Sequence, residues 1–358
     1  MHDIAVSESR NSIARLVARF IFKSVSAFHG GQQDVAPLPF APSVEKYEQR
    51  VARLDNFVRE EIRSANIPGL SIALVQGGKL AWTKGYGVTN WATRQPVEAD
   101  TCFEAASLGK PITAYAALRL ADEGLLDLEH PLSNYLKTQF VDDVRRREGM
   151  TARTVLTHTS GLSNDLQERH HRAVFEAGER FSYSGVGFMY LQKVIEEVSR
   201  MPFDRFMRET VFVQLGMTSS SYLRRSQMAR GHVHLGGLAA PLPFFPAEQP
   251  NAANLLCSTA ADLARFEAEL MAPTLVSPAL VDEMLSPQVQ IRGDAWWGLG
   301  IGLLLKESTK CFWHWGDNLD FESYMLGCPG ERIGAVVMTN SSRGLRVARR
   351  IAAKALGG

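Results

Sequence analysis

The 358-residue sequence has few cysteines and almost no net charge. Its four cysteines lie far apart in no C-x-x-C pattern, which argues against a zinc knuckle or a dense disulfide framework and leaves the redox compartment open. Lys and Arg number 39 against 38 Asp and Glu, so the formal net charge is +1 and no global field would hold the protein on nucleic acid. With 45% hydrophobic and 22% charged residues, the chain has the composition of a globular protein.

The sequence also lacks an uninterrupted apolar run near its N-terminus. Arg15, Arg19 and Lys23 recur every four residues through the apolar stretch around them. A secretory signal needs an unbroken apolar stretch and a membrane span needs about 20 apolar residues, so the sequence favours neither. It predicts a basic amphipathic helix, which would contact a membrane surface weakly, pack on the body or extend as a frayed end. We therefore expect a cytoplasmic protein.

Composition and periodicity divide the chain into an extension and a folded body. Residues 1–42 are expected to be an N-terminal extension that ends in a Pro-containing linker, and residues 43–358 one folded domain. Apolar spacing predicts helices over residues 44–62, 107–123, 186–198 and 345–356, whereas alternating or β-rich runs predict strands at 70–76, 80–88, 296–305, 311–315, 322–327 and 333–339.

The order of these elements predicts an α+β fold. Strands occur near both chain ends, in residues 43–124 and 288–358, while residues 125–287 are expected to be helix and loop. One antiparallel sheet built from both chain ends and flanked by helices satisfies this order, with the middle of the chain forming a mostly helical second lobe.

A serine and a lysine lie one helical turn apart at the start of the helix predicted at residue 107. Ser107 and Lys110 form S-x-x-K, and a spacing of three places both side chains on one helix face. A serine hydroxyl becomes a good nucleophile when a neighbouring base takes its proton, and a lysine with a lowered pKa can do so. The bare pattern is weak evidence, because serine is also a common N-cap and lysine a common surface residue.

The surroundings of this pair resemble a known family. The segments that carry the resemblance are residues 103–110 (FEAASLGK), 120–128 (LADEGLLDL), 156–162 (LTHTSGL), 178–185 (GERFSYSG), 215–218 (LGMT), 258–266 (STAADLARF) and 314–316 (HWG). In this order they resemble the serine β-lactamase-related hydrolases, a group that contains class C β-lactamases, DD-peptidases and family VIII esterases. The resemblance runs from about residue 47 to 356 and implies a β-lactamase/transpeptidase-like fold for the catalytic domain.

The resemblance implies a role for each matching residue. Ser107 would be the acylated nucleophile, Lys110 its proton acceptor, and Tyr183 the tyrosine that passes a proton to the leaving group. His314, Trp315 and Gly316 match the K-T-G or H-x-G element, where a positive or donor group orients the substrate. The backbone N–H groups of Asp317 and Ser107 would form the oxyanion hole.

Two positions differ from the family pattern. Gly185 stands where β-lactamases and peptidases usually have Asn, so a side-chain amide that would hold a substrate amide is missing. Asp317 replaces a small or neutral residue after H-x-G and would repel the carboxylate of a β-lactam if it faces the cleft. Both differences favour a serine hydrolase that cleaves an ester or related acyl bond.

Several alternatives stay open at this point. The acceptor can be water, an alcohol or an amine, which makes an acyltransferase the main rival, followed by a β-lactamase or a D-aminopeptidase-type amidase. A non-catalytic ligand-binding or scaffold protein of the same fold is less favoured because Ser107, Lys110 and Tyr183 are all present. No cofactor or metal is expected, because the pairs His170/His171 and His232/His234 lack a ligand motif. His158 is expected to fix backbone, and the oligomeric state stays open.

Overall fold

The computed structural model describes residues 35–38, 47–143, 145–166, 171–235, 238–306 and 309–357. The chain divides into two compact units, Met1–Val35 and Ala36–Gly358. All helices and strands described here belong to the second unit. The predicted basic helix and most of the predicted linker lie outside the described residues. No helix in the described part of the chain is long and apolar enough to span a membrane.

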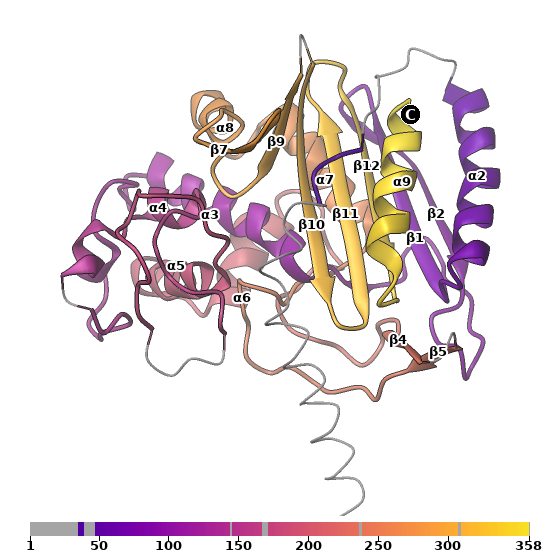
Figure 1. Cartoon of the computed structure of the whole chain (residues 1–358), viewed down its shortest axis with the longest axis horizontal. Coiled ribbons are helices and arrows are strands. Elements are labelled where there is room, and N and C mark those ends of the chain that lie inside the picture. Colours follow the sequence, from indigo (N-terminus) through magenta and orange to yellow (C-terminus); the bar gives the residue numbers. More distant parts are fainter. Residues whose placement is uncertain are drawn as a thin grey trace, which may run out of the picture. The chain divides into compact units, whose positions relative to one another are not determined.

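The second unit is built around one eight-stranded antiparallel sheet, which confirms the predicted α+β class and β-lactamase/transpeptidase-like architecture (Figure 1). The strand order is β2-β1-β12-β11-β10-β9-β8-β7, so strands from both chain ends meet where β1 pairs with β12. The strands of this sheet are β1 (Gly69–Gln76), β2 (Lys79–Gly87), β7 (Val289–Arg292), β8 (Ala295–Trp297), β9 (Gly302–Lys306), β10 (Thr309–Asn318), β11 (Phe321–Cys328) and β12 (Ile333–Thr339).

The first hairpin forms where the sequence predicts it. Gly77 and Gly78 lie between β1 and β2 with φ angles of +62° and +74°. A two-residue hairpin of this kind requires positive φ at both positions, which glycine adopts without steric cost.

Helices cover both faces of the sheet. In the view of Figure 1, α9 lies in front of β11 and β12, whereas α7 lies behind β1 and β12. The helix α2 packs against α9. The helices are α2 (Tyr47–Ser64), α3 (Gly109–Asp122), α4 (Ala152–Leu156), α5 (Gly185–Ser199), α6 (Phe203–Met207), α7 (Ala260–Met271), α8 (Pro278–Met284) and α9 (Gly344–Leu356).

Two details of the sequence prediction are corrected. The run at residues 296–305 forms two strands, β8 and β9, because the backbone turns between them and Gly300 takes a φ of +78° there. The middle of the chain also contains short strands outside the main sheet: β4 (His232–Leu235) pairs with β5 (Leu238–Pro241), and β6 (Cys257–Ser258) pairs with the earlier strand β3 (Phe103–Glu104).

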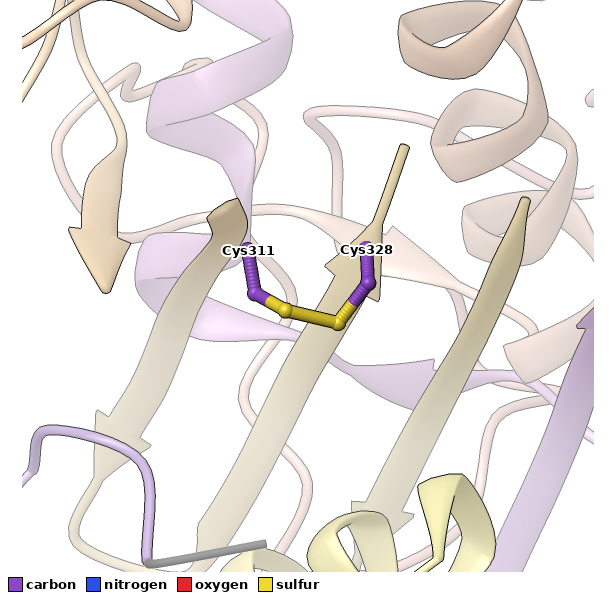
Figure 2. Close-up of a disulfide and its surroundings, with 2 residues drawn as sticks. All are labelled: Cys311 and Cys328. Carbon is purple, nitrogen blue, oxygen red and sulfur yellow. A yellow bond between two sulfur atoms is a disulfide. The ribbon is translucent and has the colours of Figure 1, made fainter. Parts of the chain in front are cut away.

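A disulfide joins Cys311 and Cys328, which lie directly opposite each other on β10 and β11 (Figure 2). Both side chains are fully buried. The bond closes a sequence separation of 17 residues and fixes the register of the hairpin whose other end carries residues 314–317. Cys102 and Cys257 are free thiols.

We expect reduction of this disulfide to destabilise the fold by about 3 kcal/mol, the chain-entropy value for a loop of this length. Urea unfolding with and without dithiothreitol measures the difference. The double variant Cys311→Ala, Cys328→Ala should lose its sensitivity to the reductant, whereas Cys102→Ala should keep it. An identical unfolding midpoint for oxidised and reduced wild-type protein would contradict the expectation.

Candidate active site

Ser107 is positioned by a short strand pair and a tight helical turn. β3 pairs with β6, and the Ala105 N–H donates to the Leu256 carbonyl at 2.6 Å. The chain then forms the 3-10 helix η3 (Ala106–Leu108), which continues directly into α3. Ala106, immediately before Ser107, is a buried non-glycine residue with a φ of +50°. Left-handed backbone of this kind is costly and persists where the surrounding structure holds it.

The Ser107 hydroxyl and the Lys110 amine are in direct contact. Lys110 Nζ donates to Ser107 Oγ at 2.9 Å. Both groups also hydrogen-bond the carbonyl oxygen of Ala253, which accepts from Ser107 Oγ at 3.2 Å. The helical spacing of three residues therefore brings serine and lysine together as the sequence indicates, and the Ala253 carbonyl holds both.

Burial changes the chemistry of Lys110. The side chain is 1% exposed, and loss of hydration lowers the pKa of its amine to about 7. The amine lies 4.8 Å from the ring centroid of Tyr183 and makes no ion pair with a described residue. A large share of Lys110 is therefore neutral at neutral pH and able to accept a proton from Ser107.

Tyr183 lies over the same pair. Its side chain is 6% exposed, and its hydroxyl is buried without a hydrogen-bond partner among the described residues. Burial raises the pKa of the phenol, the Ser107 hydroxyl lowers it, and the negative charge of Asp317 raises it further. The phenol therefore keeps its proton through the neutral range, close to Ser107.

The strand β10 passes beside η3 with one edge unpaired. Its pairing with β9 ends at Trp313, so residues 314–318 have a strand partner only on the β11 side. A Cβ atom added to Gly316 would lie 2.0 Å from the Ala105 carbonyl oxygen. Only glycine permits this approach, and it brings β10 against the backbone that carries Ser107.

His314 carries no positive charge. The side chain is fully buried, its Nδ1 lies 2.7 Å from the Trp315 carbonyl oxygen, and its Nε2 has no partner among the described residues. Burial and the nearby Lys110 amine lower the pKa of the imidazole to about 3. Of the two options that the sequence left open at this position, this lowered pKa favours a neutral imidazole over a positive group. Trp315, also buried, places its ring 5.0 Å from the Tyr183 ring.

Asp317 lies at the end of this edge and faces a second carboxylate. It pairs directly with Glu322 on β11, and Glu322 Oε2 accepts from the Leu345 N–H at the start of α9 at 2.5 Å. Burial raises the pKa of Asp317 to about 6, while burial and Asp317 raise that of Glu322 to about 8. The negative charge of Asp317 also raises the pKa of Tyr183, so Asp317 interacts electrostatically with the phenol beside Ser107.

The predicted residues Ser107, Lys110, Tyr183, His314, Trp315, Gly316, Asp317 and Gly185 all lie around one centre. Sequence reasoning missed the Ala253 carbonyl, which accepts from both Ser107 and Lys110. Trp297 is fully buried and packs against the rings of Tyr183 and His158. A backbone carbonyl cannot be recognised as a site residue from the sequence, because every residue has one.

The other histidines have structural partners. His158 Nδ1 accepts from the Ser184 N–H at 3.1 Å, beside Tyr183. His232 Nε2 accepts from the Trp91 N–H at 3.0 Å, and His234 hydrogen-bonds the Asn66 carbonyl. His171 stacks on Phe140, and His170 lies outside the described residues. Within the described ranges, no group of three or more His, Cys, Asp or Glu side chains is arranged to hold a metal ion.

The site geometry agrees with a comparison against protein-family models. The model described as Beta-lactamase matches residues 54–357. This chain belongs to the Beta-lactamase family. The family consists of serine hydrolases that act on acyl bonds, and the protein is an enzyme of this kind.

Individual members of the Beta-lactamase family are only distantly similar. Protein flp of Staphylococcus aureus (strain MRSA252) is 25% identical over 200 residues, which is 50% of this chain and 39% of that protein. The match therefore spans about two fifths of that relative's length. A solved octameric penicillin-binding protein homologue from Pyrococcus abyssi has a TM-score of 0.74 and 24% identity, covering 84% of this chain and 76% of the other.

A Beta-Lactamase/D-Alanine Carboxypeptidase from Pseudomonas syringae has a similar fold. Its TM-score is 0.71 and its identity 22%, over 84% of this chain and 98% of that one. Structural similarity at 22% sequence identity establishes a shared fold alone.

Proposed function

We propose that this Beta-lactamase family member is an ester hydrolase that works through an acyl-Ser107 intermediate. The observation that carries the proposal is the buried contact of Ser107 Oγ with Lys110 Nζ at 2.9 Å, next to the Tyr183 phenol. A fluorophosphonate probe followed by intact-mass measurement tests it. One covalent adduct on wild-type protein is expected, and no adduct would favour a non-catalytic binding protein.

In the first half-reaction the neutral Lys110 amine takes the proton of Ser107 Oγ as the oxygen attacks the scissile carbonyl. The new Oγ–C bond produces an oxyanion, which the N–H groups of Ser107 and Asp317 stabilise. The unpaired edge of β10 supports the second of these donors, since no strand occupies it beyond Trp313. The C–O bond to the leaving group then breaks.

Tyr183 completes the proton transfers. Its phenol, which keeps its proton at neutral pH, donates to the departing alkoxide, and the proton held by Lys110 replaces it. A water molecule then attacks the acyl carbonyl, gives its proton to the same pair, and releases the acid while Ser107 regains its hydrogen. Each group ends the cycle in the state in which it began.

The preference for esters follows from Asp317. A penicillin or cephalosporin carries a carboxylate, and the Asp317 carboxylate repels it in a half-buried site where charge is poorly screened. An uncharged ester avoids this repulsion. An ester also needs less help for its leaving group than an amide does.

We expect Tyr183→Phe to lower kcat/KM for an ester by at least about a hundredfold, the usual effect of removing a positioned proton donor. Steady-state kinetics measure it. Tyr190→Phe, a buried tyrosine on α5 that does not contact the Ser107–Lys110 pair, is the matched control and should stay near the wild-type rate. A near-normal rate for Tyr183→Phe would remove this role.

We also expect short-chain activated esters to be cleaved with a kcat/KM at least about tenfold above a chromogenic cephalosporin, a factor equivalent to roughly 1.4 kcal/mol. Asp317→Asn has the same shape without the charge and should narrow the gap by improving the cephalosporin. Equal or faster cephalosporin hydrolysis by wild-type protein would instead indicate a β-lactamase.

A further inference from the structure

Gln192, a buried residue in the middle of α5, uses both ends of its side-chain amide to hold one loop. Its Oε1 accepts from the Ala252 N–H at 2.8 Å, and its Nε2 donates to the Pro250 carbonyl at 3.2 Å. Gln192 is 5% exposed, and Ala252 is fully buried. Because buried polar groups are costly to leave unpaired, this pair of hydrogen bonds fixes the segment from Pro250 to Ala252 against α5.

The same loop carries the carbonyl that contacts the Ser107–Lys110 pair. Ala253 directly follows Ala252, and its carbonyl oxygen accepts from Ser107 Oγ and Lys110 Nζ. In the described part of the chain, no hydrogen bond joins Gln192 to Ser107 or Lys110 directly. Any influence of Gln192 on this pair therefore passes through the backbone of Ala252 and Ala253.

The far side of Ala253 is held as well. Asn318 Nδ2, on β10, donates to the Asn254 carbonyl at 3.0 Å. Within the loop, Asn251 Oδ1 accepts from the Ala253 N–H at 2.8 Å. The Ala253 carbonyl thus lies in a short turn supported by Gln192 on one side and by Asn318 on the other, and loss of either support lets the turn shift.

The position of the Ala253 carbonyl matters for the proton transfer. When a neutral Lys110 amine donates one of its hydrogens to this carbonyl, its lone pair is left to accept the proton of Ser107 Oγ. Without the carbonyl in place the amine rotates freely, and the lone pair faces Oγ for less of the time. A small misplacement of a reacting group is enough to lower a reaction rate strongly.

We propose that Gln192 is a positioning residue for the acyl transfer, which orients the Lys110 amine through the Ala253 carbonyl. Gln192 acts without contacting the reacting atoms, because its amide holds only the backbone of the loop. This inference rests on the proposed ester hydrolysis and adds to it a residue of α5 that the mechanism does not otherwise use.

The test is a double-mutant cycle with Lys110. Gln192→Met keeps the length of the side chain but leaves the Ala252 N–H and the Pro250 carbonyl unpaired. It should lower kcat for an activated ester about tenfold and leave KM within about twofold, because one amine serves both half-reactions. In a Lys110→Ala background, the same change should lower the residual rate by less than about twofold, since the group that Gln192 orients is gone.

Two further variants separate positioning from a general loss of stability. Gln288→Met removes the amide of a half-buried glutamine before β7 and is the matched control, which should keep the wild-type kcat. Gln192→Glu, in the protonated form that burial favours, again has an acceptor for Ala252 and a donor for Pro250, so it should recover most of the lost kcat. Urea unfolding checks that Gln192→Met is folded, and Gln192→Ala repeats the cycle if it is not.

An unchanged kcat in Gln192→Met would overturn the proposal. Equal losses in the wild-type and Lys110→Ala backgrounds would also overturn it, because they would show that Gln192 acts only on the fold. If wild-type protein cleaves no ester, the proposed function fails, and crystal structures decide on Gln192 separately. The Ala253 carbonyl should move out of hydrogen-bonding distance of Lys110 Nζ in Gln192→Met, and a carbonyl that stays in place would overturn the proposal.

Discussion

Ser107→Ala is expected to lower ester turnover by at least about a thousandfold and to abolish labelling by a fluorophosphonate. Removing the nucleophile of a serine hydrolase leaves only binding and oxyanion stabilisation, which account for a small part of the rate. Intact mass and peptide mapping should place the wild-type label on the peptide that contains Ser107. The structure supports this serine because its hydroxyl contacts a buried lysine with a lowered pKa.

The matched control is Ser226→Ala, an exposed serine far along the chain from this contact. Ser226→Ala should react with the fluorophosphonate and hydrolyse the ester as the wild-type protein does. Circular dichroism and the urea midpoint should show that Ser107→Ala folds normally, since the change removes only one side-chain oxygen. Label on another serine, or full turnover by Ser107→Ala, would remove the mechanism.

Local features of the fold could be predicted because their causes lie within a few residues. Gly77 and Gly78 define a hairpin through their backbone freedom, and the spacing of Ser107 and Lys110 defines a contact through the helix repeat. The antiparallel sheet followed from the order of strands and helices along the chain. In each case the determining physics is short in range.

Other features depended on pairings between distant segments. The Ala253 carbonyl reaches Ser107 because β3 pairs with β6, two strands of two residues each that are too short to give a periodic pattern. The partner of Gly185 is Asn164, which lies 21 positions earlier in the chain. Neither contact has a spacing rule that sequence reasoning can use.

The disulfide is an intermediate case. Strands were predicted at residues 311–315 and 322–327, and pairing them as one hairpin places Cys311 opposite Cys328. The pairing of these two predicted strands therefore indicates the disulfide. The wide spacing of the four cysteines along the chain was instead taken as evidence against a dense disulfide framework. The charge on His314 could not be read from the sequence, because full burial sets it.

The pH dependence of the reaction should report the ionisation of Lys110. A general base must be neutral, so kcat/KM for an ester should fall as pH decreases through about 7, the pKa that burial gives this amine. Below that value the neutral fraction falls tenfold per pH unit, so the rate near pH 5 should be about a hundredfold below its plateau. Lys110→Ala and Lys110→Arg should each lose at least about a hundredfold at the plateau, because neither provides a neutral amine.

The pKa values of the neighbouring groups allow their titrations to be distinguished from that of Lys110. Burial lowers the pKa of His314 to about 3, so its imidazole is neutral across this range, and burial also lowers the pKa of His158 well below its ordinary value. Asp317, with a pKa of about 6, and its partner Glu322, with a pKa of about 8, are the two rivals, and Asp317→Asn and Glu322→Gln remove them one at a time. The acid limb should persist in Asp317→Asn and vanish from the residual activity of Lys110→Ala. If the fall in rate at low pH disappears in Asp317→Asn but survives in Lys110→Ala, the titrating group is the Asp317 carboxylate. Lys110 would then not be the base that activates Ser107.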